Sequence, residues 1–428
     1  MNSRIAIVDG IRTPFIKSWT DFDNMPAQEL GRIVVRELLE RTSLTPDMVD
    51  EVIFGCVCQP ADAINIARVI SLYAGIPIEK PAYTVSRNCA SGFEAITSAV
   101  EKINSGVDEI VIAGGTESMS NIPFMYRKET TKIFMSISKS KSFLEKLKWF
   151  SKFRLRDFFN PEIGLKTGLS DTVCGLNMGQ TAEILAKEYG ITRKEQDEFA
   201  LMSHKKAIDA RDKLKEEIVP VIVPPEYEKI VPEDNGPREN LSLDDLSKLK
   251  PIFDRYTGTI TAGNSCQITD GACAVLLMKE EKAKEFGFQP LGYVRAYGYI
   301  GLEPSKMGLG PAYAIPHVLK KANLKLDDIE LIEINEAFAS QVIACEKALD
   351  SASFAEKNFG LTKPIGSINR DILNVNGGAI ALGHPVGTTG TRIVLTLLKE
   401  MKRRNLRLGL VSLCVGGGQG GAIILERL

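Results

Sequence analysis

The chain has 428 residues, of which 25% are charged and 44% hydrophobic, and its 53 basic and 54 acidic side chains leave a formal net charge of −1. That length predicts more than one domain, and the neutral balance argues against a nucleic-acid-binding protein, which gathers basic residues on one face. No apolar stretch approaches the roughly 20 residues that span a bilayer, and the first ten residues resemble a strand and turn rather than a signal peptide. We therefore expect an intracellular protein of the cytoplasm, or of the mitochondrial matrix if the chain is a processed eukaryotic one.

Strand and helix patterns alternate along the chain, which indicates an α/β fold. The strands expected in the first half are 4–8, 52–54, 81–85 and 109–113, the last ending in Gly114-Gly115. The helices expected between them are 27–40, 63–74 and one that buries Phe93 and Ile96 and ends at Gly106. Strands 329–334 and 408–413 continue this order in the second half. The similar segments 270–278 and 420–426 indicate an internal duplication.

The region between the halves, roughly 121–250, has more charge and fewer apolar strands. We interpret it as an inserted lid domain with helices over 181–189 and 193–211. Thr192 is predicted to cap the second of these helices, because Glu195 follows three residues later in the capping-box pattern.

Residues 139–156 within this insert carry five Lys and two Arg against one Glu. Large apolar side chains alternate with these charges. This pattern predicts a basic amphipathic helix that lies on a membrane or on a partner protein. A lid helix over a substrate pocket is the alternative that the sequence leaves open.

Eight cysteines and three histidines are the residues most informative about chemistry. Eight cysteines in so long a chain do not form a disulfide scaffold. Three scattered histidines and the absence of a Cys-x-x-Cys pattern predict no metal site, and Cys56 and Cys58 are interpreted as small buried residues. The counts therefore leave an enzyme that uses a thiol as the favoured class.

Cys89 lies where an expected strand turns into a helix. The positive end of the helix dipole would lower the pKa of the thiol, and the small residues that follow leave backbone N–H groups free to hold an oxyanion. A buried structural thiol is the alternative at this position.

His384 lies in a loop rich in glycine and alanine and is fixed by Pro385, which favours a catalytic base. His204 and His317 are interpreted as surface or packing residues. Cys414 follows a strand and precedes a glycine run that lacks the Lys-Ser/Thr of a phosphate-binding loop. With an ordinary pKa of about 8.5, such a thiol could both give and take a proton near neutral pH.

Seven short blocks, in the same order along nearly the whole chain, resemble those of the thiolases. They are Arg12-Thr13-Pro14-Phe15, Ser86-Arg87-Asn88-Cys89-Ala90-Ser91-Gly92, Gly114-Gly115-Thr116-Glu117-Ser118-Met119, Thr261-Ala262-Gly263-Asn264, Asn335-Glu336-Ala337-Phe338-Ala339, Gly383-His384-Pro385 and Cys414-Val415-Gly416-Gly417-Gly418. The resemblance implies the five-layered αβαβα thiolase fold, made of two duplicated halves plus an inserted loop domain. The implied boundaries are 1–121 with 251–283 for the N-terminal half, 122–250 for the loop (lid) domain and 284–428 for the C-terminal half.

The resemblance also implies a role for each residue of the site. Cys89 would be the nucleophile that carries the acyl group as a thioester, and His384 would activate it and donate to the thioester oxygen. Asn335 would hold a water that completes this first oxyanion hole. Cys414 would exchange the proton at the α-carbon of acetyl-CoA, and the N–H groups of Cys89 and Gly416 would form a second oxyanion hole.

Substrate contacts are implied at Arg238, Met178, Cys266, Phe338 and Met307, with coenzyme A as a co-substrate and no cofactor. Arg238 corresponds to an arginine that binds a phosphate of coenzyme A. The segment that begins at Met307 resembles the degradative 3-ketoacyl-CoA thiolases. Asn177 stands before Met178 where acetoacetyl-CoA thiolases usually have His, which argues against strict short-chain specificity.

The predicted activity is the CoA-dependent thiolytic cleavage of 3-ketoacyl-CoA to acetyl-CoA and a shortened acyl-CoA, an acyltransferase reaction of fatty-acid β-oxidation. The alternatives are a short-chain acetoacetyl-CoA thiolase, a 3-ketoacyl synthase, in which Cys414 would have no role, and a non-catalytic lipid-binding relative, against which the retained site residues argue. A homodimer or homotetramer is expected. The expanded segment 128–173 resembles the thiolase subunit of trifunctional fatty-acid oxidation complexes, whose partner would be a hydratase/dehydrogenase subunit, although those subunits often have His in place of Asn335.

Overall fold

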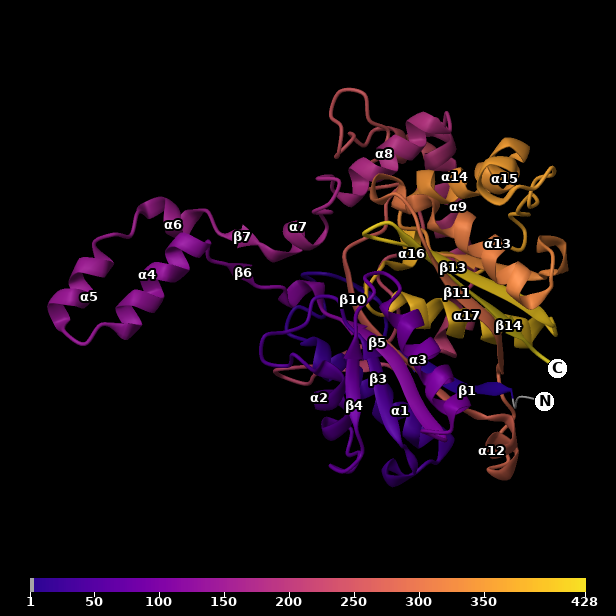
Figure 1. Cartoon of the computed structure of the whole chain (residues 1–428), viewed down its shortest axis with the longest axis horizontal. Helices are drawn as coiled ribbons and strands as arrows, with labels where there is room; N and C mark the ends of the chain where they lie inside the picture. Colours follow the sequence, from indigo (N-terminus) through magenta and orange to yellow (C-terminus); the bar gives the residue numbers. More distant parts are fainter. Residues whose placement is uncertain (1–3) are drawn as a thin grey trace. The chain divides into compact units, whose positions relative to one another are not determined.

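The computed structural model describes residues 4–428, and its main feature is a ten-stranded mixed sheet (Figure 1). Nine strands follow one another across the sheet in the order β12 (Leu331–Ile334), β13 (Leu408–Val415), β14 (Gln419–Glu426), β11 (Gly292–Gly301), β1 (Ile5–Arg12), β10 (Thr269–Lys279), β5 (Ile110–Glu117), β3 (Glu51–Gly55) and β4 (Ala82–Val85). The short strand β2 (Ile16–Lys17) pairs with β10 off this path.

The predicted duplication is visible in how these strands pair. In one half, β1 pairs antiparallel with β10, β10 antiparallel with β5, and β5 parallel with β3. In the other half, β11, β14, β13 and β12 repeat the same three senses in the same sequence. The halves join where β1 pairs antiparallel with β11.

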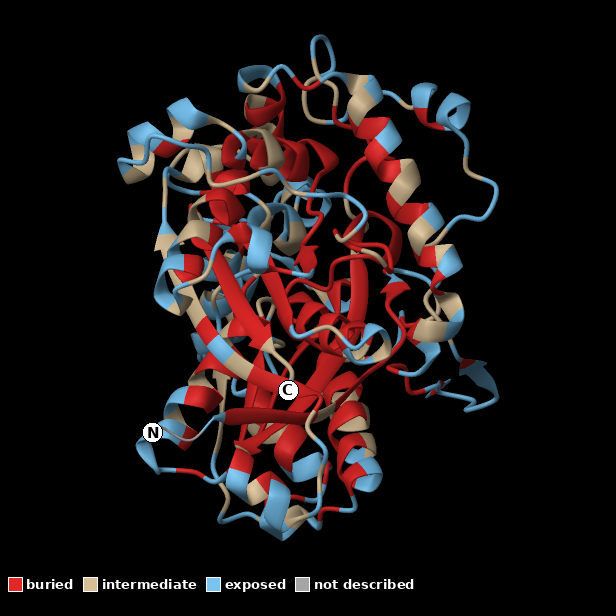
Figure 2. Ribbon diagram, turned by 90° about the vertical axis from the view of Figure 1, so that its right-hand side faces the viewer, coloured by how far each residue is buried: buried red, intermediate tan, exposed pale blue. Residues whose placement is uncertain are grey.

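Helices cover the sheet in layers, and each layer boundary is an apolar core (Figure 2). The helices are α1 (Ala27–Thr42), α2 (Ile66–Tyr73) and α3 (Ser91–Ser105) in the first half, and α13 (Gly310–Ala322), α14 (Ala339–Leu349), α15 (Ala352–Phe359), α16 (Ala379–Leu382) and α17 (Thr389–Arg404) in the second. The helices α3 and α17 share one core with strands of both halves, in which Phe93, Ile393 and Val411 are fully buried. The helices α1 and α2 pack on a second core, and α13 and α14 on a third, which gives the predicted αβαβα order.

The strand β5 runs through Gly114 and Gly115, where the sequence predicted its end. Both glycines are required by close contacts. A Cβ at Gly114 would lie 2.5 Å from the carbonyl oxygen of Cys273, and one at Gly115 would lie 2.1 Å from that of Gly387.

From residue 178 onward, the elements between the halves begin with a pair of helices. They are α8 (Met178–Glu188), α9 (Arg193–Asp209), α10 (Arg211–Lys215), β8 (Val221–Val223), β9 (Lys229–Val231), α11 (Leu243–Ser247) and, after β10, α12 (Glu280–Glu285). Single 3-10 turns lie at Pro46–Met48, Met119–Asn121, Pro304–Leu309 and Leu326–Asp328. The predicted capping box of α9 is confirmed, since Thr192 accepts from the N–H of Glu195 at 3.2 Å and the Glu195 carboxylate accepts from the N–H of Thr192 at 2.7 Å. The domain boundaries implied by the sequence stay a prediction.

Residues 122–170 form a compact unit of their own, which we call the small unit. Its elements are β6 (Phe124–Met125), α4 (Lys128–Lys139), α5 (Phe143–Phe150), α6 (Leu155–Phe159), β7 (Glu162–Ile163) and α7 (Gly164–Gly168), with β6 and β7 paired antiparallel. Within residues 4–428, no helix combines the length and the apolar character needed to cross a bilayer.

The single basic helix predicted over 139–156 is wrong. The chain forms two helices there, α5 and α6, after α4 has ended at Lys139. Ser142 starts α5 by accepting from the N–H of Glu145 at 3.2 Å. Between the helices, Phe153 packs against Phe134 and Phe158, with ring centroids 4.8 and 5.0 Å away. Helix capping and this aromatic cluster therefore override the continuous periodicity.

Candidate active site

Cys89 lies in a tight turn between β4, which ends at Val85, and α3, which begins at Ser91. Asn88 before it has a left-handed backbone with φ of 45°. The Ser91 hydroxyl accepts from the N–H of Arg87 at 2.9 Å and donates to the carbonyl of Asn88 at 2.7 Å. These bonds fix the turn that presents the half-buried thiol.

The glycine loop after β13 meets this turn. The Asn88 side-chain amide donates to the carbonyl of Gly416 at 2.7 Å. Burial raises the pKa of the Cys89 thiol, although the backbone N–H groups of Gly416 and of Cys89 itself bond to it and oppose that rise. The lowered pKa predicted from the helix terminus is therefore wrong, because desolvation of the thiolate outweighs the N–H groups. The two N–H groups assigned to an oxyanion hole nevertheless both act on the pKa of the Cys89 thiol.

His384 is buried with one ring nitrogen bonded and the other free. Its Nδ1 lies 2.6 Å from Oγ1 of Thr389, and that hydroxyl donates its only proton to the carbonyl of Pro385 at 3.0 Å. We therefore assign the ring proton to Nδ1, which leaves a lone pair on Nε2. Within residues 4–428 Nε2 has no hydrogen-bond partner. Burial, aided by the charge of Arg392, lowers the pKa of His384 to about 4, so the ring is neutral near pH 7.

Asn335 follows β12, and its backbone N–H donates to the carbonyl of Ser412 on β13 at 2.9 Å. Its side chain is 1% exposed, yet neither the amide nitrogen nor the amide oxygen has a partner among the described residues. Buried polar atoms are normally paired, so an unpaired amide indicates a position that a ligand or water completes.

Cys414 is fully buried at the end of β13. Burial, followed by the neighbouring thiols of Cys89, Cys345 and Cys266, raises its pKa well above the ordinary value. The predicted ordinary pKa is wrong because the loss of water around the thiolate outweighs the one opposing group, the backbone N–H of Cys414 itself. The group rests as a thiol, the form that donates a proton.

Three of the predicted substrate contacts gather around Cys414. Met178, Met307 and Phe338 belong with it to one apolar cluster. Cys266 lies alongside, since its N–H donates to the carbonyl of Ala337 at 3.0 Å, and burial, with Cys89 nearby, raises the pKa of its thiol to about 12.

Arg238 lies apart from that cluster, with an exposed side chain. Its backbone N–H donates to Nδ1 of His204 at 3.2 Å. Burial, together with the charge of Arg238, lowers the pKa of His204 to about 4, which fits the predicted packing role. His317 is exposed, which fits a surface residue.

Two residues of the site were missed at the sequence level. Thr389 orients the ring of His384, and Asn88 joins the Cys89 turn to the glycine loop. Their signal was their position, since each lies within five residues of a predicted catalytic group. Neither side chain reveals its partner before the fold is known.

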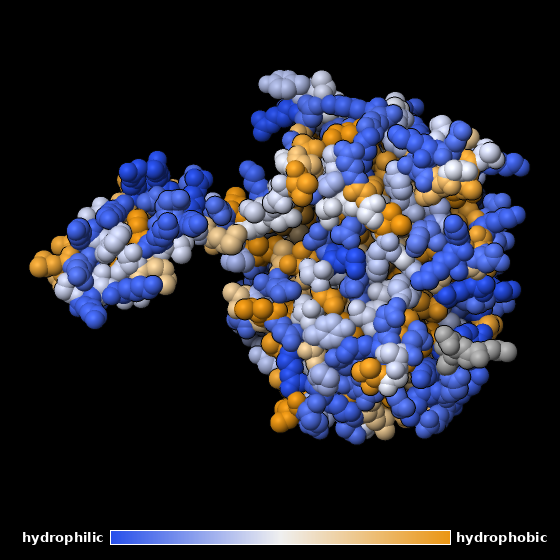
Figure 3. Space-filling model, in the orientation of Figure 1, coloured by the Kyte–Doolittle hydropathy of each residue, from blue (hydrophilic) through white to orange (hydrophobic). Residues whose placement is uncertain are grey.

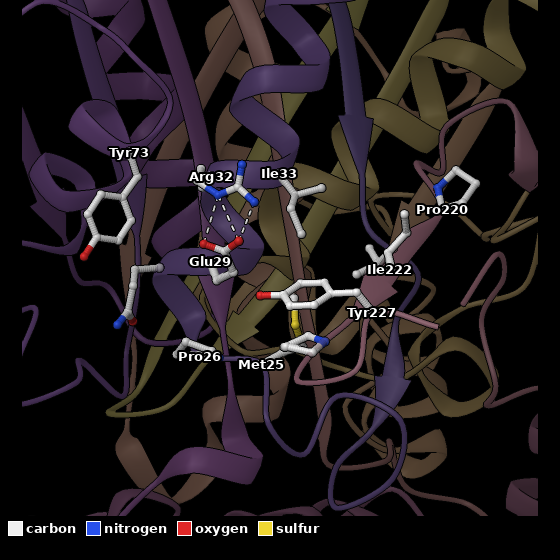
Figure 4. A pocket seen from close by; sticks show the side chains of 12 residues that line it. Met25, Pro26, Glu29, Arg32, Ile33, Tyr73, Pro220, Ile222 and Tyr227 are labelled. Atoms are coloured by element: carbon white, nitrogen blue, oxygen red, sulfur yellow. Dashed lines mark hydrogen bonds and ion pairs between the residues drawn. The ribbon is translucent and has the colours of Figure 1, made fainter. Parts of the chain in front are cut away.

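The cavity in Figure 4 lies elsewhere, between α1 and the segment around β8. It has a volume of about 570 Å³ and none of the predicted site residues lines it. Its guanidinium, on Arg32, already pairs with Glu29. Among residues 4–428, no three His, Cys, Asp or Glu side chains are grouped as a metal site requires.

A thiol at a helix start, a neutral imidazole and an unpaired amide are groups with which enzymes transfer acyl groups through a thioester. The fold and the site therefore define an acyltransferase, with Cys89 as the candidate nucleophile.

Known proteins identify the family. Residues 5–281 match the model of the thiolase N-terminal domain, and residues 288–427 match that of the thiolase C-terminal domain. The chain belongs to the thiolase family. A 3-ketoacyl-CoA thiolase of Pseudoalteromonas translucida is 43% identical, with 99% of this chain and 97% of the relative covered, and one of Escherichia coli O157:H7 is 42% identical over the same shares.

Solved structures agree on the fold. The acetyl-CoA acetyltransferase of Bacillus anthracis superposes with a TM-score of 0.87 at 37% identity, with all of both chains covered. Human mitochondrial 3-ketoacyl-CoA thiolase in complex with CoA gives a TM-score of 0.85 at 35% identity, covering 100% of this chain and 98% of that one.

Proposed function

We propose that the protein is a 3-ketoacyl-CoA thiolase, an acyltransferase that cleaves 3-ketoacyl-CoA with coenzyme A to acetyl-CoA and a shortened acyl-CoA. The observation that carries the proposal is the proximity of the half-buried Cys89 to the fully buried Cys414, in a chain that also holds a neutral His384 with an unpaired Nε2. The relatives of similar length carry the same activity in their names. Coenzyme A is a co-substrate, and no cofactor is proposed.

The chemistry follows from the protonation states. Nε2 of His384 takes the proton of the Cys89 thiol as the sulfur attacks C3 of the substrate, and the C2–C3 bond then breaks. The electron pair of that bond becomes the enolate of acetyl-CoA, and Cys414 gives the proton that C2 needs. Coenzyme A finally attacks the thioester on Cys89 and gives its thiol proton to the Cys414 thiolate, while His384 returns its proton to the departing Cys89 sulfur. The shortened acyl-CoA leaves with all three side chains restored, so that one difficult step is divided into two. Asn335 and the N–H groups of Cys89 and Gly416 stabilise the two oxyanions.

Two variants test these roles. Cys89→Ala is expected to form no covalent acyl adduct with acetyl-CoA by mass spectrometry, and an adduct of unchanged yield would refute the proposal. Cys414→Ala is expected to accept the acetyl group on Cys89 yet to lose deuterium exchange at the methyl group of acetyl-CoA. Full exchange in that variant would remove Cys414 from the proton transfer.

The proposed activity on longer acyl chains is inferred from Asn177. Its side chain accepts from the N–H of Gln180 at 3.0 Å and caps α8, so it is engaged in the helix start rather than free for substrate. A thiolysis series from C4 to C16 3-ketoacyl-CoA should show activity on the long chains. Turnover of the C4 substrate alone would instead establish the short-chain acetoacetyl-CoA activity.

A homodimer or homotetramer is supported by the sheet edge. The strand β4 ends the sheet, pairs only with β3 among the described residues and leads directly to Cys89. Open edges of this kind pair with another chain unless they are protected. Light scattering after size exclusion is expected to give at least twice the monomer mass of 47.0 kDa.

The small unit supports attachment to an anionic membrane surface, with reaction in the cytoplasm or the mitochondrial matrix. Its apolar side chains stand among hydrophilic ones (Figure 3), and the sequence shows that many of these are Lys or Arg. The apolar side chains that are more than 60% exposed include Phe143, Leu144, Phe150, Leu155 and Phe159. Exposed aromatic groups flanked by Lys and Arg are typical of segments that bind lipid headgroups.

Vesicle binding tests this attachment. Vesicles of phosphatidylglycerol and phosphatidylcholine should retain the protein, vesicles of phosphatidylcholine alone should retain less, and Phe143→Asp with Leu144→Asp should abolish retention. Equal retention of this variant refutes the membrane role. Co-purification with a hydratase/dehydrogenase subunit that the same substitutions abolish would assign the surface to that partner instead.

A further inference from the structure

Two buried glutamates that the proposed chemistry does not use hold the loop that carries His384. The loop starts in α16 and continues through Gly383, whose φ is 99°, to Gly387. Both glutamates, Glu117 and Glu336, have no exposed surface. Burying a carboxylate costs free energy unless its oxygens accept hydrogen bonds, so each buried glutamate is expected to make specific hydrogen bonds that serve the fold or the site.

Glu336 is hydrogen-bonded to the start of the loop. Its carboxylate accepts from the hydroxyl of Ser203 at 2.6 Å, from the side-chain amide of Asn374 at 2.8 Å and from the N–H of Ile380 in α16 at 3.2 Å. The Ser203 hydroxyl in turn accepts from the N–H of Gly378 at 3.2 Å. A Cβ at Gly378 would lie 2.1 Å from the carboxyl carbon, so the backbone rests directly on this carboxylate.

Glu117, which belongs to the N-terminal half of the fold, is hydrogen-bonded to the end of the loop. Its carboxylate accepts from the N–H of Gly387, three residues after His384, at 2.8 Å. It also accepts from the N–H groups of Val57 at 3.1 Å and Cys58 at 2.9 Å, which follow β3. The far end of the loop is thereby fixed to the half that supplies Cys89.

We propose that Glu336 and Glu117 are positioning residues, which clamp the two ends of the His384 loop and so aim Nε2 at the reacting thiol and substrate. Glu336 directly follows Asn335, so the same clamp sets the distance between the unpaired amide and the imidazole. The role deepens the proposed function and rests on it for its effect on rate. A misplacement of about 1 Å in such a group can cost on the order of 100-fold in rate.

Glutamine variants of both positions test the clamp. The substituted amide has the shape of the carboxylate, but its NH₂ group must face at least one of the donors around it. Glu336→Gln and Glu117→Gln should each lower kcat on the order of 100-fold, with KM within about twofold of wild type. The matched control is Glu51→Gln, because Glu51 is equally buried but pairs with Lys102, away from the loop.

A spectroscopic readout separates positioning from general stability. With only three histidines in the chain, the ring signals of selectively labelled His can be assigned by substitution. The His384 signal should move in both glutamine variants while that of the exposed His317 stays in place, and neither should move in Glu51→Gln. If Glu336→Gln folds poorly, Ser203→Ala is the milder replacement. It should shift the His384 signal and lower kcat relative to the wild-type enzyme.

The outcomes are distinct. An unmoved His384 signal in the glutamine variants, or a loss of kcat that Glu51→Gln reproduces, overturns the clamp. Absence of thiolysis by the wild-type enzyme overturns the proposed function, whereas the His384 signal still decides the positioning role.

Discussion

The hydrogen bond between Thr389 and His384 offers a direct test of the assigned ring tautomer. In Thr389→Val the shape of the side chain is kept, but Nδ1–H of His384 loses its acceptor at 2.6 Å in a fully buried place. An unpaired buried donor costs about 1–3 kcal/mol, and the ring can also turn or shift its proton to Nε2. If that cost falls on the transition state, kcat drops about 5- to 150-fold.

The assay is steady-state thiolysis of a 3-ketoacyl-CoA, with kcat and KM determined separately. We expect KM to stay within about twofold, since Thr389 is buried and the loss concerns the base rather than substrate binding. Thr388→Val is the matched control, because its hydroxyl donates to the carbonyl of Gly271 at 2.9 Å and does not touch His384. A Thr389→Val enzyme with the kcat of the Thr388→Val control would refute the tautomer and its role.

Two further predictions concern stability. Gly310→Ala should lower the free energy of unfolding by about 1–3 kcal/mol in urea titrations, because its Cβ would lie 2.5 Å from the backbone oxygen of Gln419. Gly301→Ala is the control and should be neutral, because no atom lies within 4 Å of its Cβ. Equal losses in the two variants would contradict this packing argument. The folded chain lowers the pKa values of His204 and His384 to about 4, so the unfolded chain takes up these protons at a higher pH than the folded chain does. The free energy of unfolding therefore falls as the pH drops from about 6.5 to 4, by about 3 kcal/mol for each histidine. His204→Gln should remove about half of this histidine contribution in unfolding titrations at pH 7 and pH 4.5, and an unchanged pH dependence would show that His204 is not the group responsible.

The placement of the candidate site residues could be predicted from the sequence because they lie in short motifs at strand ends. Cys89, Asn335 and Cys414 each follow a strand that the alternating pattern also predicts. The parallel neighbours β12 and β13 bring Asn335 and Cys414 to one side of the sheet, and Met178 and Phe338 pack with Cys414. Cys89 follows β4 at the other edge of the sheet, and the contact of Asn88 with Gly416 brings it to Cys414. Strand patterns and motifs therefore predicted which candidate residues lie at strand ends, and their roles stay a prediction. No local signal pointed to Thr389.

The pKa directions could not be predicted, because they depend on burial by distant segments. A helix start acts on Cys89 within one turn, whereas the burial that raises its pKa depends on how the folded chain packs around the turn. The interruption between α5 and α6 has the same origin. Phe153 leaves the helical pattern because it packs on Phe134, a contact that local periodicity does not contain.

The raised thiol pKa values and the lowered histidine pKa together describe a resting state in which neither the two thiols nor the imidazole carries a charge. Cys89 and Cys414 hold their protons, and His384 lacks one. A preformed thiolate–imidazolium pair would instead require a lowered cysteine pKa and a raised histidine pKa. In the proposed mechanism, charge would develop when the substrate brings an oxygen that the N–H groups of Cys89 and Gly416 stabilise, and proton transfer to Nε2 would accompany attack on the carbonyl. The same burial that makes the free thiols weak nucleophiles therefore ties acyl transfer to the presence of the substrate.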